Sequence, residues 1–204
     1  MFTYGDDIYD TIPIQFNFSY FHYNFDRLVL DTNGYIYFSG LKCCDITLQS
    51  YKSNAISGLN YDITTEIEGE IVYENLNSTS TDYDSIRSDL NRLNSTIVFV
   101  AKDIFRISYV NIPDFLTGSY YASFQIILAR DQYSSSYVVL KFYSCLTGLN
   151  MLTKPGLYYL DGSGRGLSLE ISNPCGSSNV NLTGTWVFNV TVPRSESIYF
   201  HKLN

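Results

Sequence analysis

Apolar and polar residues alternate along several short stretches of the chain, most clearly in "LVLDTNGYIYF". Both flanks change character every second residue, as expected for strands with one buried face, and Asn33-Gly34 between them predicts a type I′ turn. The pattern therefore predicts a β-hairpin within residues 25–40.

Similar stretches recur at short intervals. "EIEGEIVYE" alternates around Gly69, and "TIVFVAKDIFRISYVNI" predicts two strands that separate near Lys102-Asp103. "YYASFQIILARDQYSSSYVVLKFYSC" predicts a long hairpin with its tip at residues 131–136. "PGLYYLDGSGRGLSLEIS" predicts a short pair around a glycine turn, and "TGTWVFNVTV" a last strand that contains Trp186, expected in the core. About ten strands at this spacing predict an all-β fold, a two-sheet antiparallel β-sandwich.

One stretch has the period of a helix instead. In "STDYDSIRSDLNRLN", residues 80–94, Ile86, Leu90 and Leu93 recur at helical spacing behind several possible N-caps. We expect one short helix that crosses one end of the sandwich. Because no glycine-serine linker, long charge run or internal repeat divides the chain, residues 1–192 are predicted to form one domain and residues 193–204 a C-terminal tail.

Composition agrees with this fold and limits the partners. Aromatic residues make up 16% of the chain, with 19 Tyr and 13 Phe, and such residues favour pleated, half-buried surfaces. The net charge is −7 and no basic cluster is present, which argues against nucleic acid as a partner. Since no apolar run approaches the roughly 18 residues that span a bilayer, we expect no membrane insertion.

Sequons indicate an extracellular protein. Five N-x-S/T acceptors are present, and three of them fall in polar connections where a glycan would lie in water. The predicted glycosylation sites are Asn17, Asn77, Asn94, Asn181 and Asn189. The first ten residues, "MFTYGDDIYD", lack the basic start and apolar block of a signal peptide, so a secretion signal would not be part of this chain.

The cysteines also indicate an extracellular protein. Cys43, Cys44, Cys145 and Cys175 are even in number and lack the spacing of a zinc site, so disulfides are expected. Because adjacent cysteines rarely pair with each other, Cys43 and Cys44 are predicted to bridge to Cys145 and Cys175 in either order. The alternative is four buried free thiols.

Four blocks of sequence resemble the nidogen-like extracellular (NIDO) domain. They are "YGDDIYDTIPIQFNFSYFHYNFDRLVLDTNGYIYFSG", "AISGLNYDITTEIEGEIVYE", "SFQIILARDQYSSSYVVLKFY" and "SSNVNLTGTWVFNV". Asp62 lies near the acidic positions of the second block, where Gly58 and Leu59 replace the tryptophan of the family. The resemblance covers nearly all of residues 4–192. It implies an extracellular, non-catalytic module of adhesion proteins, matrices and filaments.

Few residues offer chemistry. His22 and His201 lie at opposite ends of the chain without ligand spacing, and "DGSGRG" lacks the lysine and helix of a phosphate-binding loop, so it is expected to form a hairpin turn. The acidic clusters are typical of solvated loops and strand edges. Two of them would offer oxygen ligands to calcium, although neither has the pattern of an EF-hand: Asp6, Asp7 and Asp10, or Asp82, Asp84 and Asp89. We expect no enzyme, no cofactor and no metal.

The tail completes the expectations about function. After Pro193, which cannot donate a ladder hydrogen bond, Ile198 and Phe200 alternate with Tyr199 and Leu203. Such a strand would fold back on its own sheet, or add to an edge strand of the next molecule. We therefore expect a non-enzymatic extracellular structural glycoprotein that self-assembles head-to-tail into a fibre or matrix, with copies of itself or other extracellular proteins as partners. The alternative is a cell-surface adhesion or ligand-binding ectodomain module.

Overall fold

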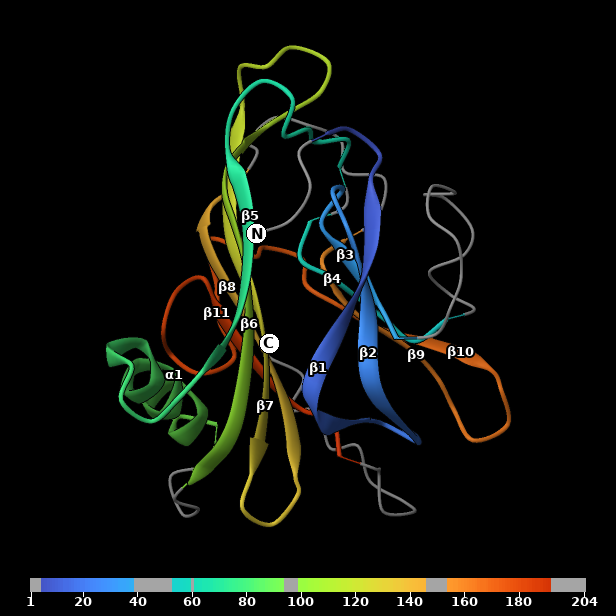
Figure 1. The fold of residues 1–204 in the computed structure, drawn as a ribbon, viewed down its shortest axis with the longest axis vertical. Coiled ribbons are helices and arrows are strands. Elements are labelled where there is room, and N and C mark those ends of the chain that lie inside the picture. Colours follow the sequence, from blue (N-terminus) through green and yellow to red (C-terminus); the bar gives the residue numbers. More distant parts are fainter. Residues whose placement is uncertain (1–4, 39–52, 60, 94–98, 146–153, 192–204) are drawn as a thin grey trace.

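The computed structural model describes residues 5–38, 53–59, 61–93, 99–145 and 154–191. In this part of the chain two antiparallel sheets face each other, with a helix outside one of them (Figure 1). The six-stranded sheet has the order β1-β2-β3-β4-β9-β10, and the five-stranded sheet the order β11-β8-β7-β6-β5. The predicted all-β sandwich with one short helix is confirmed.

The strands of the six-stranded sheet are β1 (Tyr9–Tyr20), β2 (Tyr23–Asp31), β3 (Tyr35–Tyr37), β4 (Ala55–Ser57), β9 (Gly156–Leu160) and β10 (Gly166–Glu170). Those of the five-stranded sheet are β5 (Glu70–Leu76), β6 (Ala101–Pro113), β7 (Tyr121–Asp131), β8 (Ser136–Ser144) and β11 (Thr185–Asn189).

The main core fills the space between the sheets. Along β1 every second residue from Ile12 to Tyr20 is buried, because alternate side chains of a strand point to the same face. The five-stranded sheet contributes Tyr109 and Phe124, whose rings stack with their centres 4.3 Å apart. Burying one such large side chain contributes roughly 1.5–3 kcal/mol to the stability of the fold.

A second core lies under the helix. Helix α1 (Thr81–Asn91) buries Ile86 and Leu90 against the outer face of the five-stranded sheet, where Ile127 and Val139 belong to the same cluster (Figure 1). The helix is confirmed, but the prediction that it crosses one end of the sandwich is wrong. Strands β6, β7 and β8 carry apolar side chains on both faces. The helix packs on their outer face and buries the apolar side chains there.

The predicted hairpin forms, but with a wider turn. Strands β2 and β3 pair Leu30 with Ile36, and residues 32–34 connect the end of β2 at Asp31 to the start of β3 at Tyr35. Only Gly34 in this connection has a positive φ, of +88°, so the type I′ turn predicted for Asn33-Gly34 is wrong. The reason is the side chain of Asp31, whose Oδ1 accepts a hydrogen bond of 2.6 Å from the Asn33 amide and builds a local turn of its own.

The sequence predicted two strands that separate near Lys102-Asp103, but β6 begins at Ala101, residues 99–100 are not in a strand, and residues 96–98 lie outside the described residues. Strand β6 runs through Lys102-Asp103, and a shift in register against β7 between Ala101 and Asp103 absorbs the irregularity as a bulge. The tip at residues 131–136 and the glycine turn between β9 and β10 are confirmed. In that glycine turn Asp161 Oδ1 accepts hydrogen bonds from the amides of Ser163 and Arg165, so "DGSGRG" closes a hairpin.

Candidate functional site

Four of the five predicted glycosylation sites lie in the described residues, and all four are exposed. Asn17 lies on β1, Asn77 follows β5, Asn181 precedes β11, and Asn189 ends β11. The fifth, Asn94, lies outside the described residues. Each of the four side chains faces water, where a glycan can be accommodated without disturbing the core. Their occupancy stays a prediction.

One disulfide joins the end of β8 to the segment before β11. Cys145 and Cys175 are bonded, with their Cα atoms 6.2 Å apart. The prediction that these two cysteines pair with Cys43 and Cys44 is therefore wrong. The reason is local, because β11 pairs with β8 and so brings the segment before β11 beside the end of β8. Cys43 and Cys44 lie outside the described residues.

Trp186 belongs to the same corner of the fold. Its ring is half-buried and packs against the main core, while its Nε1 donates a hydrogen bond of 3.2 Å to the carbonyl of Pro174. Trp186 was expected in the core, and it lies at the edge of the core, where the indole holds the segment that contains Cys175.

Three carboxylates gather at the end of the sandwich where the chain enters β1. Asp6, Asp7 and Asp62 each place a carboxylate oxygen within 4.8 Å of the others, and no second such group is found in the described part of the chain. The hairpin connection holds this group, since the Asn33 side chain donates to Asp7 (2.8 Å) and accepts from the amide of Ile63 (3.0 Å). Of the three carboxylates weighed together from the sequence, Asp6 and Asp7 belong to this group and Asp10 does not.

Like charges and burial dominate the electrostatics of this group. Burial raises the pKa of Asp6, and the charges of Asp7, Asp62 and Glu66 raise it further. Burial likewise raises the pKa of Asp62, and the charge of Asp7 adds to it. Nearby, burial raises the pKa of Asp31 to about 7. The group therefore attracts positive charge, but three carboxylates are well short of the roughly six to eight oxygen ligands of calcium, and we assign no metal to it.

The second acidic group weighed as a source of calcium ligands, Asp82, Asp84 and Asp89, is not brought together. Asp82 pairs with Arg106 at 2.6 Å, Asp84 with Arg87 at 3.2 Å, and Asp89 with Lys141 at 2.5 Å. Each carboxylate thus has its own cation, and the three are dispersed along the helix.

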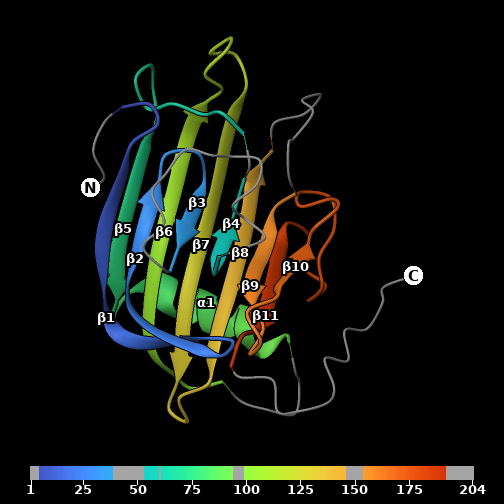
Figure 2. The same cartoon turned by 90° about the vertical axis from the view of Figure 1, so that its right-hand side faces the viewer.

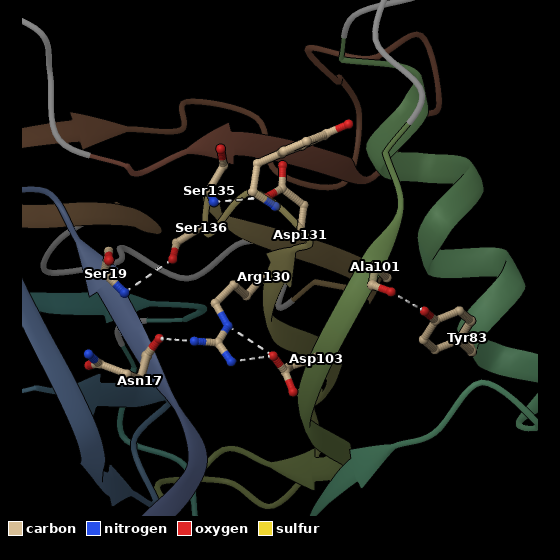
Figure 3. A network of polar contacts seen from close by, with 10 residues as sticks. Asn17, Ser19, Tyr83, Ala101, Asp103, Arg130, Asp131, Ser135 and Ser136 are labelled. Carbon is tan, nitrogen blue, oxygen red and sulfur yellow. Dashed lines mark hydrogen bonds and ion pairs between the residues drawn. The ribbon is translucent and has the colours of Figure 1, made fainter.

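A polar groove of about 620 Å³ opens where β1 approaches β5, β6 and the helix. Its walls are Gln15, Phe16, Asn75, Leu76, Asn77, Ser78, Tyr83, Ala101, Lys102, Asp103 and Ile104. Beside it, the Arg130 guanidinium donates two hydrogen bonds to Asp103 (2.9 and 2.6 Å) and one to the carbonyl of Asn17 (3.3 Å), as Figure 3 shows. The same guanidinium lies 5.4 Å from the centre of the Phe16 ring.

This network joins the two sheets. Arg130 and Ser136 belong to the five-stranded sheet, and their partners Asn17 and Ser19 belong to β1 of the other sheet (Figure 3). Because Arg130 and Asp103 bind each other, neither is left free to act as an acid or base. We interpret the network as a structural link along the edge of the sandwich.

The remaining predicted site residues offer no catalytic arrangement within the described residues. His22 is exposed in the turn between β1 and β2. His201 and the predicted self-assembly residues of the tail lie outside the described residues: Ile198, Tyr199, Phe200 and Leu203. Among the described residues no helix has the length and apolar character needed to cross a bilayer.

Comparison with known protein families, curated proteins and solved structures found no match. The resemblance to the NIDO domain therefore stays a prediction that rests on four blocks of sequence.

Proposed function

We propose that the chain is a non-enzymatic extracellular structural glycoprotein whose copies assemble head-to-tail into a fibre or matrix. The observation that carries the extracellular part is the Cys145–Cys175 disulfide, because such bonds persist mainly in oxidising compartments. The exposure of Asn17, Asn77 and the two sequons that flank β11 supports it, since each is accessible to a glycan.

The non-enzymatic part rests on how the charged side chains are used. Arg106 binds Glu74 and Asp82, Arg130 binds Asp103, and Lys141 binds Asp89. Catalytic groups need a free partner atom aimed at a substrate, whereas these groups bind one another across strands and between the helix and the sheet. Their arrangement supports a scaffold.

Assembly is the part that rests on the tail sequence and on the edge strands of the sandwich. Strands β1 and β10 are the edges of one sheet and β5 is an edge of the other. The outer side of β11 is already occupied by the Asn179 side chain, which binds the amide and the carbonyl of Val187. An edge strand can accept an additional strand from another molecule, and the alternation around Ile198 and Phe200 is typical of such a donor. A head-to-tail contact that does not close into a ring builds a filament.

The test compares the full chain with a variant that lacks the tail, both secreted by eukaryotic cells. We expect filaments or sheets from the full chain in electron microscopy, and a folded monomer after deletion of residues 193–204. A variant with Tyr133→Ser, which changes an exposed side chain far from the tail in sequence, is the control and should assemble normally. Assembly that survives the deletion would contradict the tail mechanism, and uniform monomers of the full chain would favour the adhesion module instead.

A further inference from the structure

Exposed apolar side chains gather at the end of the sandwich where β6 turns into β7. Five of them come from two segments, residues 61–69 and 113–121, which lie together at the upper end of Figures 1 and 2. We name this group the apolar crest; it consists of Ile67 (59% exposed), Phe115 (44%), Leu116 (74%), Tyr120 (43%) and Tyr121 (39%). Large exposed apolar patches on soluble proteins commonly mark contact surfaces.

The two segments form one continuous surface. The amide of Phe115 donates a hydrogen bond of 2.9 Å to the carbonyl of Asp62. Ile67 lies so close to Gly118 that a Cβ on that glycine would be 3.2 Å from Ile67 Cδ1. The hydroxyl of Tyr121 lies 3.4 Å from Glu68 Oε2. The crest is therefore built from side chains that a single partner can reach at once.

The crest is also preorganised. The carboxylate of Asp114, which is fully buried, accepts hydrogen bonds from the amides of Thr117 (2.7 Å), Ser119 (3.1 Å) and Tyr120 (2.9 Å). Burial opposes ionisation of Asp114, but these hydrogen bonds outweigh it and hold the pKa of that carboxyl below its usual range. A loop fixed in this way loses little conformational entropy on binding, which favours affinity.

The charged side chains around the apolar crest are negative. Asp62, whose carbonyl binds the amide of Phe115, lies together with Asp6 and Asp7, and Glu66 and Glu68 flank Ile67 in the sequence. The described residues of this end, 5–10, 61–69 and 113–121, contain no lysine or arginine. An anionic membrane or a nucleic acid would be repelled here, while a cationic surface would be attracted.

We propose that the apolar crest is a docking surface for a protein whose exposed apolar side chains are flanked by lysine or arginine. The apolar side chains supply the buried centre of the contact and the carboxylates a charged rim, which is the usual anatomy of a specific interface. The proposal rests on the proposed function in so far as the chain acts through protein contacts, and it names one partner surface that such contacts use.

The test measures a defined probe against matched variants. The probe is a short fluorescein-labelled peptide in which lysine alternates with phenylalanine and leucine, and its binding is followed by fluorescence anisotropy. The crest variants are Phe115→Ser/Leu116→Ser and Glu66→Gln/Glu68→Gln. The controls are Tyr133→Ser, which is 76% exposed on the β7–β8 turn at the opposite end, and Asp26→Asn/Asp84→Asn, which removes the same charge elsewhere. Thermal unfolding confirms that each variant is folded.

We expect each crest variant to weaken binding about tenfold and the controls to leave it unchanged. Added salt should weaken binding to the wild-type chain. A peptide with glutamate in place of lysine should not bind. Equal losses in crest and control variants, or equal binding of the glutamate peptide, would overturn the proposal. So would failure of the lysine peptide combined with self-association that Phe115→Ser/Leu116→Ser abolishes, because the occupant would then be a second copy.

Electron microscopy of the same variants separates this inference from the proposed function. Peptide binding by a chain that stays monomeric supports the crest and contradicts assembly. Filaments from a chain that does not bind the lysine peptide support assembly and contradict the crest.

Discussion

At the scale of single residues, the turn of the β2–β3 hairpin combines a left-handed glycine with a buried carboxyl group. Gly34 adopts a left-handed conformation there, and Asp31 is almost fully buried. Both depend on neighbours far away in the sequence, since Leu59 lies against Gly34 and the charge of Asp7 acts on Asp31. Single substitutions here report on the packing of the whole end of the sandwich.

Asp31→Asn should change how stability depends on pH. Burial raises the pKa of the Asp31 carboxyl to about 7 in the folded chain, above its usual value of 3.8. The folded state therefore binds the proton more tightly, and the stability that this group contributes is present below about pH 4 and lost as the pH rises to about 7, at up to about 1.4 kcal/mol per pH unit. We expect Asp31→Asn, which keeps an acceptor oxygen for the Asn33 amide, to flatten this slope and to be more stable than wild type at pH 8.

Urea titrations of wild type and variant across this pH range check the prediction. Asp26→Asn serves as the control, because Asp26 is exposed beside Arg27. Parallel curves for wild type and Asp31→Asn would show that Asp31 titrates normally.

Gly34→Ala should destabilise the fold more than Gly164→Ala. Both glycines have a similar positive φ, of +88° and +83°, so both substitutions share a backbone cost of roughly 1–2 kcal/mol. A Cβ at Gly34 would also lie 2.5 Å from the carbonyl oxygen of Leu59, whereas one at Gly164 meets no atom within 4 Å. Chemical denaturation measures the difference, and equal losses would mean that the backbone near Leu59 yields easily.

At the scale of elements, the sequence predicted those features that depend on residues close together in the chain. The β2–β3 hairpin, the 131–136 tip, the β9–β10 turn and helix α1 all follow from residues next to each other in the sequence. The position of the helix did not follow, because the apolar outer face of the five-stranded sheet exists only once three strands are side by side. The carboxylate group escaped prediction for the same reason, since Asp62 and Asp7 meet through a side chain of the hairpin, Asn33.

Removing the disulfide should weaken the attachment of β11. The bond closes a loop with a sequence separation of 30, and in the chain-entropy account such a loop contributes about 3–4 kcal/mol. We expect Cys145→Ser/Cys175→Ser to lose about this much free energy of unfolding. Peptide mapping without reduction verifies the bond in the wild-type chain. An unchanged denaturation midpoint would indicate that the unfolded chain is already compact in this region.

At the scale of the whole molecule, the features proposed to carry function lie in different places. The apolar crest and the carboxylates occupy one end of the sandwich, near the upper end of β6 and β7 (Figure 2). The described sequons lie instead on β1, after β5 and on both sides of β11. The crest could not be predicted from the sequence, because isolated apolar residues in two loops look the same whether they are buried or exposed. Only the folded arrangement shows that they share a surface.

Protein from a eukaryotic source should carry glycans on at least three of the five sequons. Four of them are exposed, which makes them accessible to modification. Intact mass before and after glycosidase treatment gives the number of glycans, and Asn→Gln variants assign them. A single unmodified mass would contradict both the glycans and the extracellular location.

The place of Asn17 has a practical consequence for anyone who prepares this protein. Asn17 lies within β1, an edge strand, and its side chain points to solvent. A glycan there would cover main-chain groups on which another chain could otherwise align. Bacterial cytosol adds no such glycan and keeps thiols reduced, so we expect irregular aggregates from that host and none from a eukaryotic secretory host, where association should be limited to ordered assembly. Because the host also changes the state of the Cys145–Cys175 disulfide, Asn17→Gln made in the secretory host isolates the effect of the carbohydrate, and we expect it to aggregate irregularly.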